Sequence, residues 1–529
     1  MEKEKIFLEI IKEIQKRKPK TKEELSKIKL SFSKKYKIPF PKDTEIFSFY
    51  EKLKKEKKIK EDKNLEKILV KKKIRSLSGI VSITCLTKPF PCPGKCIFCP
   101  QAQNFPKSYL PEEPAAERAK KVSYDPFLQM KERIKSLEIQ GHPTEKIELI
   151  ILGGCFNFYP KEYQEWFIKR CFDAANEKES KNLEEAKKIN ETAKKRIVGI
   201  SIETRPDLIS EKEIIFFRYL GITKVEIGVQ IPDDEILKLN QRGHTKKEII
   251  FATKLLKDAG FKVQYHLMPN LFGSSFENDI KRFKEIFENE NYRPDWIKLY
   301  PCVVLEKTKL FKLWKEGKYK PYDDKKLIEL LIEIKKSLPY YVRVARLFRD
   351  IPANQIVAGC KISNLREVIK KEMEKRKIKC KCIRCREVRE RYNPKDKFYL
   401  FREDYFASGG KEIFLSYETK NREKLFSFLR LRVPSTFFEK KKHFIKVLDG
   451  AGIVRELHTY GKSLPLKMRN SLSPQHKGLG KKLLLLAEKI LKKEFGLKKI
   501  AVISGVGVRE YYRKLGYTLQ DEYMIKKLS

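Results

Sequence analysis

Between residue 78 and about residue 360, short apolar stretches alternate with amphipathic ones, and this alternation constrains the fold more than any other feature. The amphipathic stretch 246–259 stops before Gly260, as a helix does at a C-terminal glycine. Strand, loop and helix repeated in this way predict parallel βαβ units that wind into a full or partial barrel. The predicted strands are residues 79–84, 146–152, 197–203, 224–229, 262–268 and 296–300, with 341–347 as a seventh.

Glycines and polar side chains follow several of these predicted strands. Gly153 and Gly154 follow the second strand, Glu-Thr-Arg-Pro-Asp at 203–207 ends the third, and Pro-Asn-Leu-Phe-Gly at 269–273 follows the fifth. In barrel enzymes the active site lies at the carboxyl ends of the strands. The sequence therefore predicts an active site at that end.

Three cysteines follow the first predicted strand with the spacing C-x3-C-x2-C. Cys92, Cys96 and Cys99 can hold three irons of a [4Fe–4S] cluster, because thiolates are the usual iron–sulfur ligands. The iron without a protein ligand can then chelate the amino and carboxylate groups of S-adenosylmethionine. Zinc is the alternative, although zinc loops favour paired C-x2-C ligands. Gly153 and Gly154 fit the glycine pair that binds the methionine amine in radical S-adenosylmethionine enzymes, and by themselves they also fit any tight turn.

A second group of glycines opens a predicted helix near the C-terminus. The run Gln475-His476-Lys477-Gly478-Leu479-Gly480 precedes a Leu-rich stretch at 481–488. Backbone N–H groups at such a helix start can approach a pyrophosphate, and the helix dipole favours its charge. The pattern Q-x-x-G-x-G resembles the pyrophosphate loop of GNAT acetyltransferases and predicts acetyl-CoA binding. Tyr512, in a segment like the last motif of that fold, is a candidate to protonate the CoA thiolate, with a packing role as the alternative.

Three more cysteines lie in a short basic link at residues 376–392. Cys380, Cys382 and Cys385 could hold zinc with a fourth ligand from elsewhere, for which Cys302 and Cys360 are candidates. Free thiols are the alternative. The other cysteines at 155 and 171 are expected to be ordinary and half-buried.

The charge balance points to a nucleic-acid partner. The chain has 118 Lys and Arg against 71 Asp and Glu, and this surplus favours binding to a phosphate backbone. Adaptation to heat explains many charges but not the imbalance. Residues 1–75 are Lys-rich with helically spaced apolar residues, so we expect small basic helices that either contact phosphates or simply face solvent. Without a signal peptide or a long apolar run, we expect no membrane association, a cytoplasmic location and reduced cysteines.

With both motifs in this order, the chain resembles the catalytic subunit of Elongator, a family of tRNA uridine acetyltransferases. The similar runs are 92–99, 202–207, 228–230, 240–245, 266–271, 455–458 and 501–507, within residues 76–529. The charge of residues 1–75 alone predicts a basic tRNA-binding region there. For the rest of the chain the resemblance implies an α/β fold that starts with a partial (β/α) radical S-adenosylmethionine barrel at 76–375. A Cys-rich link at 376–392 and a GNAT acetyltransferase domain at 393–529 follow.

The resemblance also implies a reaction, the synthesis of 5-carboxymethyluridine at the wobble uridine of tRNA. A 5′-deoxyadenosyl radical takes a hydrogen from the acetyl methyl group of acetyl-CoA, the carbon radical adds to C5, and hydrolysis of the thioester leaves the carboxymethyl group. Glu456 and His458 are candidates to direct the hydrolytic water, and Lys146 matches a lysine that contacts acetyl-CoA from the radical side. The residues expected to line acetyl-CoA are Glu456, Leu457, His458, Thr459, Gln475, Gly478, Leu479, Gly480, Lys481 and Tyr512.

Two other functions fit parts of the sequence. A protein lysine acetyltransferase with a scaffolding radical domain needs no tRNA, and the basic charge balance argues against it. A non-catalytic tRNA-binding platform needs neither the cysteine motif nor the glycine loop. The sequence does not decide which tRNAs are used, whether the chain forms homodimers or binds accessory subunits, or whether residues 1–75 are needed for activity.

Overall fold

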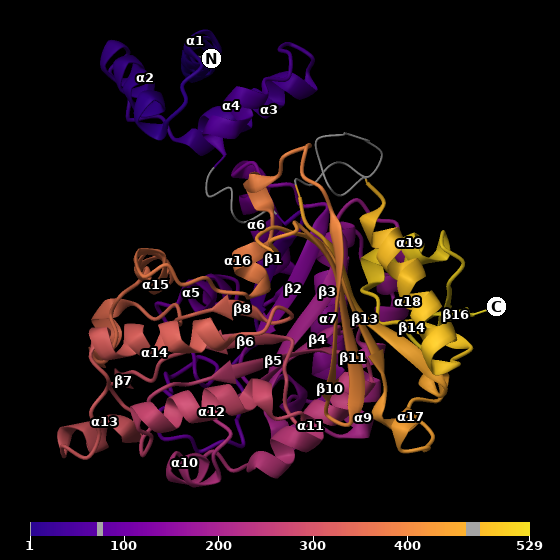
Figure 1. Cartoon of the computed structure of the whole chain (residues 1–529). Coiled ribbons are helices and arrows are strands. Elements are labelled where there is room, and N and C mark those ends of the chain that lie inside the picture. The colour runs from indigo at the N-terminus through magenta and orange to yellow at the C-terminus, as the bar shows by residue number, and fades with distance from the viewer. Residues whose placement is uncertain (1, 71–77, 462–476, 529) are drawn as a thin grey trace.

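The computed structural model of the chain describes residues 2–70, 78–461 and 477–528 (Figure 1). Its central part is a seven-stranded sheet in which every neighbouring pair is parallel, in the order β1-β2-β3-β4-β5-β6-β8. The two end strands do not pair with each other in the described chain, so the sheet is a partial barrel. The strands are β1 (Val81–Leu86), β2 (Lys146–Leu152), β3 (Arg196–Thr204), β4 (Lys224–Gln230), β5 (Lys262–Leu267), β6 (Trp296–Leu299) and β8 (Arg343–Arg346).

All seven predicted strands are present, so the partial barrel is confirmed. The first strand lies two residues later than predicted, because its pairing with β2 begins at Val81 opposite Ile147. Helices connect the strands, and the predicted helix 246–259 is present as α11 (Lys246–Asp258), which begins at a capping box formed by Thr245 and Glu248. The other helices of this part are α5 (Pro114–Lys121), α6 (Pro126–Ile139), α7 (Lys161–Asn176), α8 (Leu183–Asn190), α9 (Glu211–Tyr219), α10 (Asp234–Leu239), α12 (Phe276–Glu288), α13 (Lys309–Lys315), α14 (Asp324–Ser337), α15 (Leu365–Lys375) and α16 (Ile383–Arg386). A small antiparallel pair joins β7 (Val304–Leu305) and β9 (Ile356–Ala358).

The C-terminal part is a second seven-stranded sheet, in the order β10-β11-β12-β13-β14-β16-β15. It is mixed, since β13 and β14 run parallel and the other pairs are antiparallel. The predicted Leu-rich helix is present as α18 (Leu479–Phe495), which packs on β11, β12 and β13. The remaining elements are β10 (Tyr399–Ala407), β11 (Gly410–Glu418), β12 (Leu425–Val433), α17 (Ser435–Phe438), β13 (Ala451–Thr459), β14 (Lys499–Val502), α19 (Arg509–Arg513), β15 (Thr518–Gln520) and β16 (Tyr523–Lys527).

The two sheets meet through close backbone contact and buried ion pairs. A Cβ atom on Gly505 would lie 2.1 Å from the carbonyl oxygen of Val198, so only glycine allows this approach to β3. Arg455 on β13 donates to Asp295, just before β6, and to Glu412 on β11, and all three side chains are almost fully buried. Because buried charges are stable only when paired, this network fixes how the second sheet lies against the barrel.

The N-terminal part is a separate group of four helices, as the Lys-rich sequence predicts (Figure 1). Its apolar residues form a small core of their own that includes Ile10, Leu25, Ile46 and Tyr50. It touches the barrel where α3 meets α6. The helices are α1 (Glu2–Arg17), α2 (Lys22–Lys35), α3 (Asp43–Lys55) and α4 (Lys63–Leu69). Within the described residues, we find no helix with the length and apolar character that a membrane span requires.

Candidate active site

The three cysteines predicted to bind iron lie in the loop between β1 and α5. Cys92, Cys96 and Cys99, the cluster cysteines, are partly exposed and line one cavity. Their sulfur atoms do not form a compact group in the described chain, where the only groups of three close ligand atoms lie elsewhere. A [4Fe–4S] cluster takes each thiolate on a different iron, so spread sulfur atoms fit a cluster better than a single ion.

Cationic side chains surround this loop. Nη1 of Arg242 lies 2.9 Å from Sγ of Cys96, and the ammonium of Lys107 donates to the carbonyl oxygen of Gly94. A hydrogen bond with Cys155 lowers the pKa of Cys92 to about 6, which favours its thiolate. Burial raises the pKa of Cys99 to about 11, so this thiol requires a bound metal to lose its proton at neutral pH.

Two buried polar atoms beside the cluster loop lack hydrogen-bond partners in the described structure, and this bears on whether a polar ligand fits here. Nη1 of Arg205 and Oε1 of Gln230 are buried and have no hydrogen-bond partner in the described structure. Both side chains line the same cavity as the cluster cysteines. Since buried polar groups are normally paired, these atoms indicate a polar ligand at this place.

Gly153 and Gly154 directly follow β2, with φ angles of +135° and +91°. A Cβ atom on Gly153 would lie 1.8 Å from Oγ1 of Thr87, so no other residue fits at this turn. Gly154 lines the cavity and its Cβ position is open apart from a backbone oxygen at 3.7 Å. The turn therefore leaves backbone exposed to a ligand beside the cluster loop, where the methionine amine is predicted to bind.

The barrel interior below the loop holds a polar network. Glu226 on β4 accepts hydrogen bonds from His266 at 2.8 Å, from Ser201 at 2.8 Å and from Lys298. Glu203, Glu226 and His266 lie close enough to bind a metal ion, but the Lys298 ammonium already contacts Glu226 and lies 3.8 Å from Glu203. Because a cation occupies the group, we interpret it as a structural lining of the barrel.

One cavity of about 1210 Å³ passes through the barrel and joins its two ends. At the carboxyl ends of the strands it is lined by the cluster cysteines and Gly154. At the other end it is lined by Lys224 and Lys262, at the starts of β4 and β5, and by three residues of the second sheet, Glu456, His458 and Tyr460. The cavity therefore connects the cluster cysteines with Glu456 and His458, two of the residues predicted to line acetyl-CoA.

Strand β13 divides the residues predicted to line acetyl-CoA between its two faces. Glu456 and His458 face the barrel cavity, whereas Leu457 and Thr459 face Gly480 at the start of α18. Although burial opposes it, the neighbouring Arg430 and Lys262 lower the pKa of Glu456, so it is a carboxylate at neutral pH. Burial lowers the pKa of His458 to about 4, so its imidazole is neutral, and its buried Nε2 atom has no partner in the described structure.

The glycine loop opens α18 as predicted. Gly478 has φ +70° with no atom within 4 Å of its Cβ position, and Gly480 lies beside Thr459 and Tyr511. Leu479 is buried and Lys481 is exposed in the first turn of the helix. The predicted Gln475 lies outside the described residues.

Two other predicted residues lie away from the barrel cavity. Tyr512 is 6% exposed within the core of the second sheet, beside the rings of Tyr511 and Tyr517, and burial raises its pKa. The tyrosine hydroxyl beside Gly480, 3.5 Å from its Cβ position, belongs to Tyr511. Lys146 begins β2 and is half-buried, but it is not part of the cavity wall.

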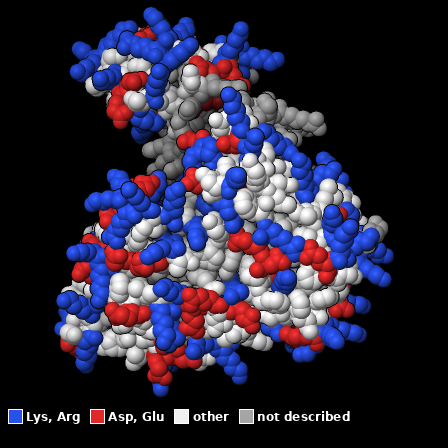
Figure 2. Space-filling model, in the orientation of Figure 1, with Lys and Arg blue, Asp and Glu red and all other residues white. Residues whose placement is uncertain are grey.

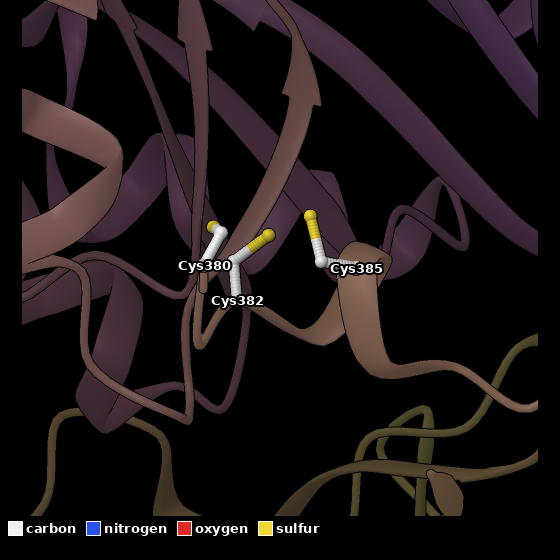
Figure 3. Close-up of side chains that lie close together, drawn as sticks. All are labelled: Cys380, Cys382 and Cys385. Atoms are coloured by element: carbon white, nitrogen blue, oxygen red, sulfur yellow. The ribbon is translucent and has the colours of Figure 1, made fainter. Parts of the chain in front are cut away.

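The cysteines of the link form a compact group (Figure 3). Ligand atoms of Cys380, Cys382 and Cys385 lie within 4.8 Å of one another. A tetrahedral zinc ion places its sulfur ligands about 3.8 Å apart, given Zn–S bonds of about 2.3 Å, so this group fits a single ion. Cys302 and Cys360 are not part of it, because Cys302 contacts Tyr319 and Cys360 contacts Asp324.

Several residues of the site were missed by sequence reasoning. Cys155, expected to be ordinary and half-buried, is 8% exposed and contacts Cys92, and Cys171 is fully buried. Arg205 and Arg242 lie in the runs 202–207 and 240–245 that carried the resemblance, but no chemistry was assigned to them. Both lie in loops far from the cluster loop in sequence, after β3 and between α10 and α11, so spacing alone could not reveal their contacts with it.

The comparisons with known proteins agree with this geometry. Residues 91–283 match the Radical SAM superfamily, and residues 294–375 match the Radical_SAM C-terminal domain. The chain is 49% identical to the tRNA uridine(34) acetyltransferase of Methanocaldococcus infernus, covering 99% of this chain and 98% of that protein. It is 41% identical to Elongator complex protein 3 of Homo sapiens, covering 86% of each. The solved structure of archaeal Methanocaldococcus infernus Elp3 with an N-terminal deletion matches with a TM-score of 0.75 and 48% identity, covering 85% of this chain and all of that one.

Proposed function

Because this chain belongs to the family of tRNA uridine(34) acetyltransferases and Elongator complex protein 3, we propose that it modifies the wobble uridine of tRNA with acetyl-CoA. The proposed product is 5-carboxymethyluridine. The observation that carries the proposal is the single cavity, which joins the cluster cysteines to Glu456 and His458 on the second sheet. An acyl group and a uridine base in this cavity can both approach the radical source.

The Radical SAM match implies a [4Fe–4S] cluster and S-adenosylmethionine. The cluster cysteines would hold the cluster, and the backbone at Gly153 and Gly154 would bind the methionine amine. When bound, the cluster and S-adenosylmethionine would supply a radical that can abstract hydrogen from an unactivated carbon such as the acetyl methyl group. Arg205 and Arg242 orient the loop and place positive charge beside the thiolates.

Acetyl-CoA is proposed to bind the second sheet as in GNAT acetyltransferases. The N–H groups at Gly478–Gly480 face the pyrophosphate, since Gly480 leaves room beside Thr459. The neutral imidazole of His458 can accept a proton, but burial lowers its pKa to about 4 and makes it a weak base, so His458 and Glu456 are both proposed to direct the hydrolytic water. Glu456 stays anionic beside Arg430, 2.9 Å away, and orders that end of the cavity. Tyr512 and Lys146 remain proposals from family resemblance, and the position of Tyr512 favours the packing alternative.

The chain is proposed to divide at 75, 375 and 392 into a tRNA-binding region, a radical domain, a link and an acetyltransferase domain. Figure 2 shows Lys and Arg side chains covering much of the N-terminal helices on the visible face. Exposed lysines at this density suit contacts with RNA phosphates. We therefore assign part of the tRNA affinity to residues 1–75.

Cys380, Cys382 and Cys385 are proposed to bind zinc. The ammonium of Lys335 lies 3.7 Å from Sγ of Cys385, where it stabilises thiolates. In Cys382→Ser, zinc measured by elemental analysis should fall from about one ion per chain to near zero, with iron unchanged. Equal zinc in both proteins would leave these cysteines as free thiols.

The direct test is the reaction itself. Anaerobically reconstituted protein is incubated with tRNA, acetyl-CoA and S-adenosylmethionine, and the digested nucleosides are analysed by mass. The expected result is 5-carboxymethyluridine that requires all three substrates. Unmodified tRNA together with acetylated lysines in added protein would instead support a lysine acetyltransferase.

A further inference from the structure

Four arginines line the part of the cavity where the link passes the barrel. Arg343 lies on β8, Arg366 on α15, Arg384 on α16 and Arg389 just after it, and Glu387 is the acidic residue among them. All four guanidinium groups are half-buried. Arg366, Arg343 and Arg389 are each close enough to act electrostatically on Arg384.

The single carboxylate is already occupied. Glu387 accepts a hydrogen bond from Arg343 at 2.8 Å and another from Arg389. Arg366 donates to the backbone carbonyls of Val344 and Ala345, at 3.3 and 3.1 Å. Arg384 has no hydrogen bond and no ion pair with any described residue. It is therefore the guanidinium left available to a ligand.

Among the described residues, Glu387 is the carboxylate that acts electrostatically on Arg384, and its hydrogen bonds go to Arg343 and Arg389. Segments 71–77 and 462–476, which the structure does not describe, contain no Asp or Glu. Four guanidinium groups therefore share the Glu387 carboxylate in this part of the described cavity wall.

Clustered guanidinium groups in a cavity repel one another unless an anion binds between them, and guanidinium matches phosphate geometry well. We propose that this arginine cluster binds a backbone phosphate of the tRNA strand that carries the target uridine into the cavity, with Arg384 as its main ligand. This inference rests on the proposed function and specifies where the substrate strand enters.

The CoA phosphates are a less suitable occupant. Their proposed site is the glycine loop, which lies on the α18 face of β13 beside Thr459. The arginine cluster lies on the opposite side, where Arg343 donates to the hydroxyl of Tyr460 at 2.9 Å. The second sheet lies between the glycine loop and the arginine cluster. A CoA molecule whose phosphates bind at the glycine loop therefore does not place them on the arginine cluster.

The test compares three variants of the full chain. Arg384→Gln removes the charge, Arg384→Lys keeps it, and Arg376→Gln removes a nearby charge that is already paired with Glu329 and Glu372 at 2.7 and 2.9 Å. Affinity for an anticodon stem–loop is measured at several salt concentrations. Arg384→Gln should bind about tenfold more weakly, because a charged hydrogen bond contributes about 1.5–3 kcal/mol. Its log–log salt slope should fall by about 0.7–1, whereas Arg384→Lys and Arg376→Gln keep the slope of the unmodified protein.

A second measurement separates binding from a structural role. Without ligand, Arg384→Gln should melt at the same or a higher temperature than the unmodified protein, because repulsion is removed. A lower melting temperature, or an unchanged affinity and slope, overturns the proposal. Weaker acetyl-CoA binding by calorimetry with unchanged stem–loop affinity would assign the cluster to CoA and also overturn it. If the wild-type protein binds the stem–loop but does not form 5-carboxymethyluridine in tRNA, the proposed function fails. The binding test still measures whether the arginine cluster contacts a phosphate.

Discussion

Replacing Asp295 by Asn should loosen the contact between the barrel and the second sheet. Asp295 is fully buried, and its carboxylate accepts hydrogen bonds from Arg455 at 2.9 and 2.5 Å and from the backbone N–H of Val263 at 2.8 Å. The Lys257 ammonium lies 3.5 Å away. Asn has nearly the same shape but no charge, so it leaves Arg455 and Lys257 with one carboxylate, Glu412, instead of two.

Breaking one side of a buried ion pair costs about 3–5 kcal/mol, because the remaining charge stays out of water. We expect Asp295→Asn to lose that much free energy of unfolding in urea denaturation at pH 7. The control is Glu494→Gln, which removes an exposed partner of Arg402, where each side chain keeps 35–40% of its surface exposed. Surface pairs contribute about 0–1 kcal/mol, so this control should stay close to the unmodified protein.

The direction in which the pKa of Asp295 is shifted predicts how the stability lost in Asp295→Asn changes with pH. Burial alone raises the pKa of Asp295, but Arg455 and Lys257 outweigh it and hold the pKa far below its usual value. The Asp295 carboxylate therefore makes its full contribution to the free energy of unfolding above its unfolded-state pKa of about 3.9. This contribution is lost as the pH falls further. The difference between the unmodified protein and Asp295→Asn should be constant from pH 7 to 5 and shrink below about pH 4. A loss under 1 kcal/mol at pH 7, or a difference that grows in acid, would refute the reasoning.

Four further predictions concern the cofactors and the RNA. Replacing all three cluster cysteines by Ser should abolish the brown colour and iron binding of reconstituted protein, and retention of full iron would contradict the assignment. A folded truncation that starts near residue 76 should bind tRNA more weakly and with a smaller salt slope; unchanged values would place all binding in the later parts. Gly480→Glu should weaken acetyl-CoA binding in calorimetry, because a side chain and a negative charge meet the pyrophosphate. If Tyr512 protonates the CoA thiolate, Tyr512→Phe should slow tRNA-stimulated CoA release with little change in affinity, whereas the packing role that its buried position favours predicts release at the wild-type rate.

The sequence determined those features that depend on local pattern. Alternating apolar and amphipathic stretches specified all seven barrel strands, because strand length and helical periodicity are properties of short segments. The C-x3-C-x2-C run and the Gly478–Gly480 loop were identified for the same reason, since one loop supplies all the groups involved. The Lys-rich N-terminal helices followed from composition and spacing alone.

Only the tertiary structure decided which distant residues share a site. Cys155, in the loop after β2, and Arg242, in the loop between α10 and α11, contact the cluster cysteines, and no spacing rule relates them. The alternation of β13 sends His458 into the barrel cavity and Thr459 toward α18, a division that depends on how the second sheet lies against the barrel. That placement is set by Arg455 with Asp295 and Glu412, charges 160 and 43 residues away, whose burial and pairing exist only in the folded chain.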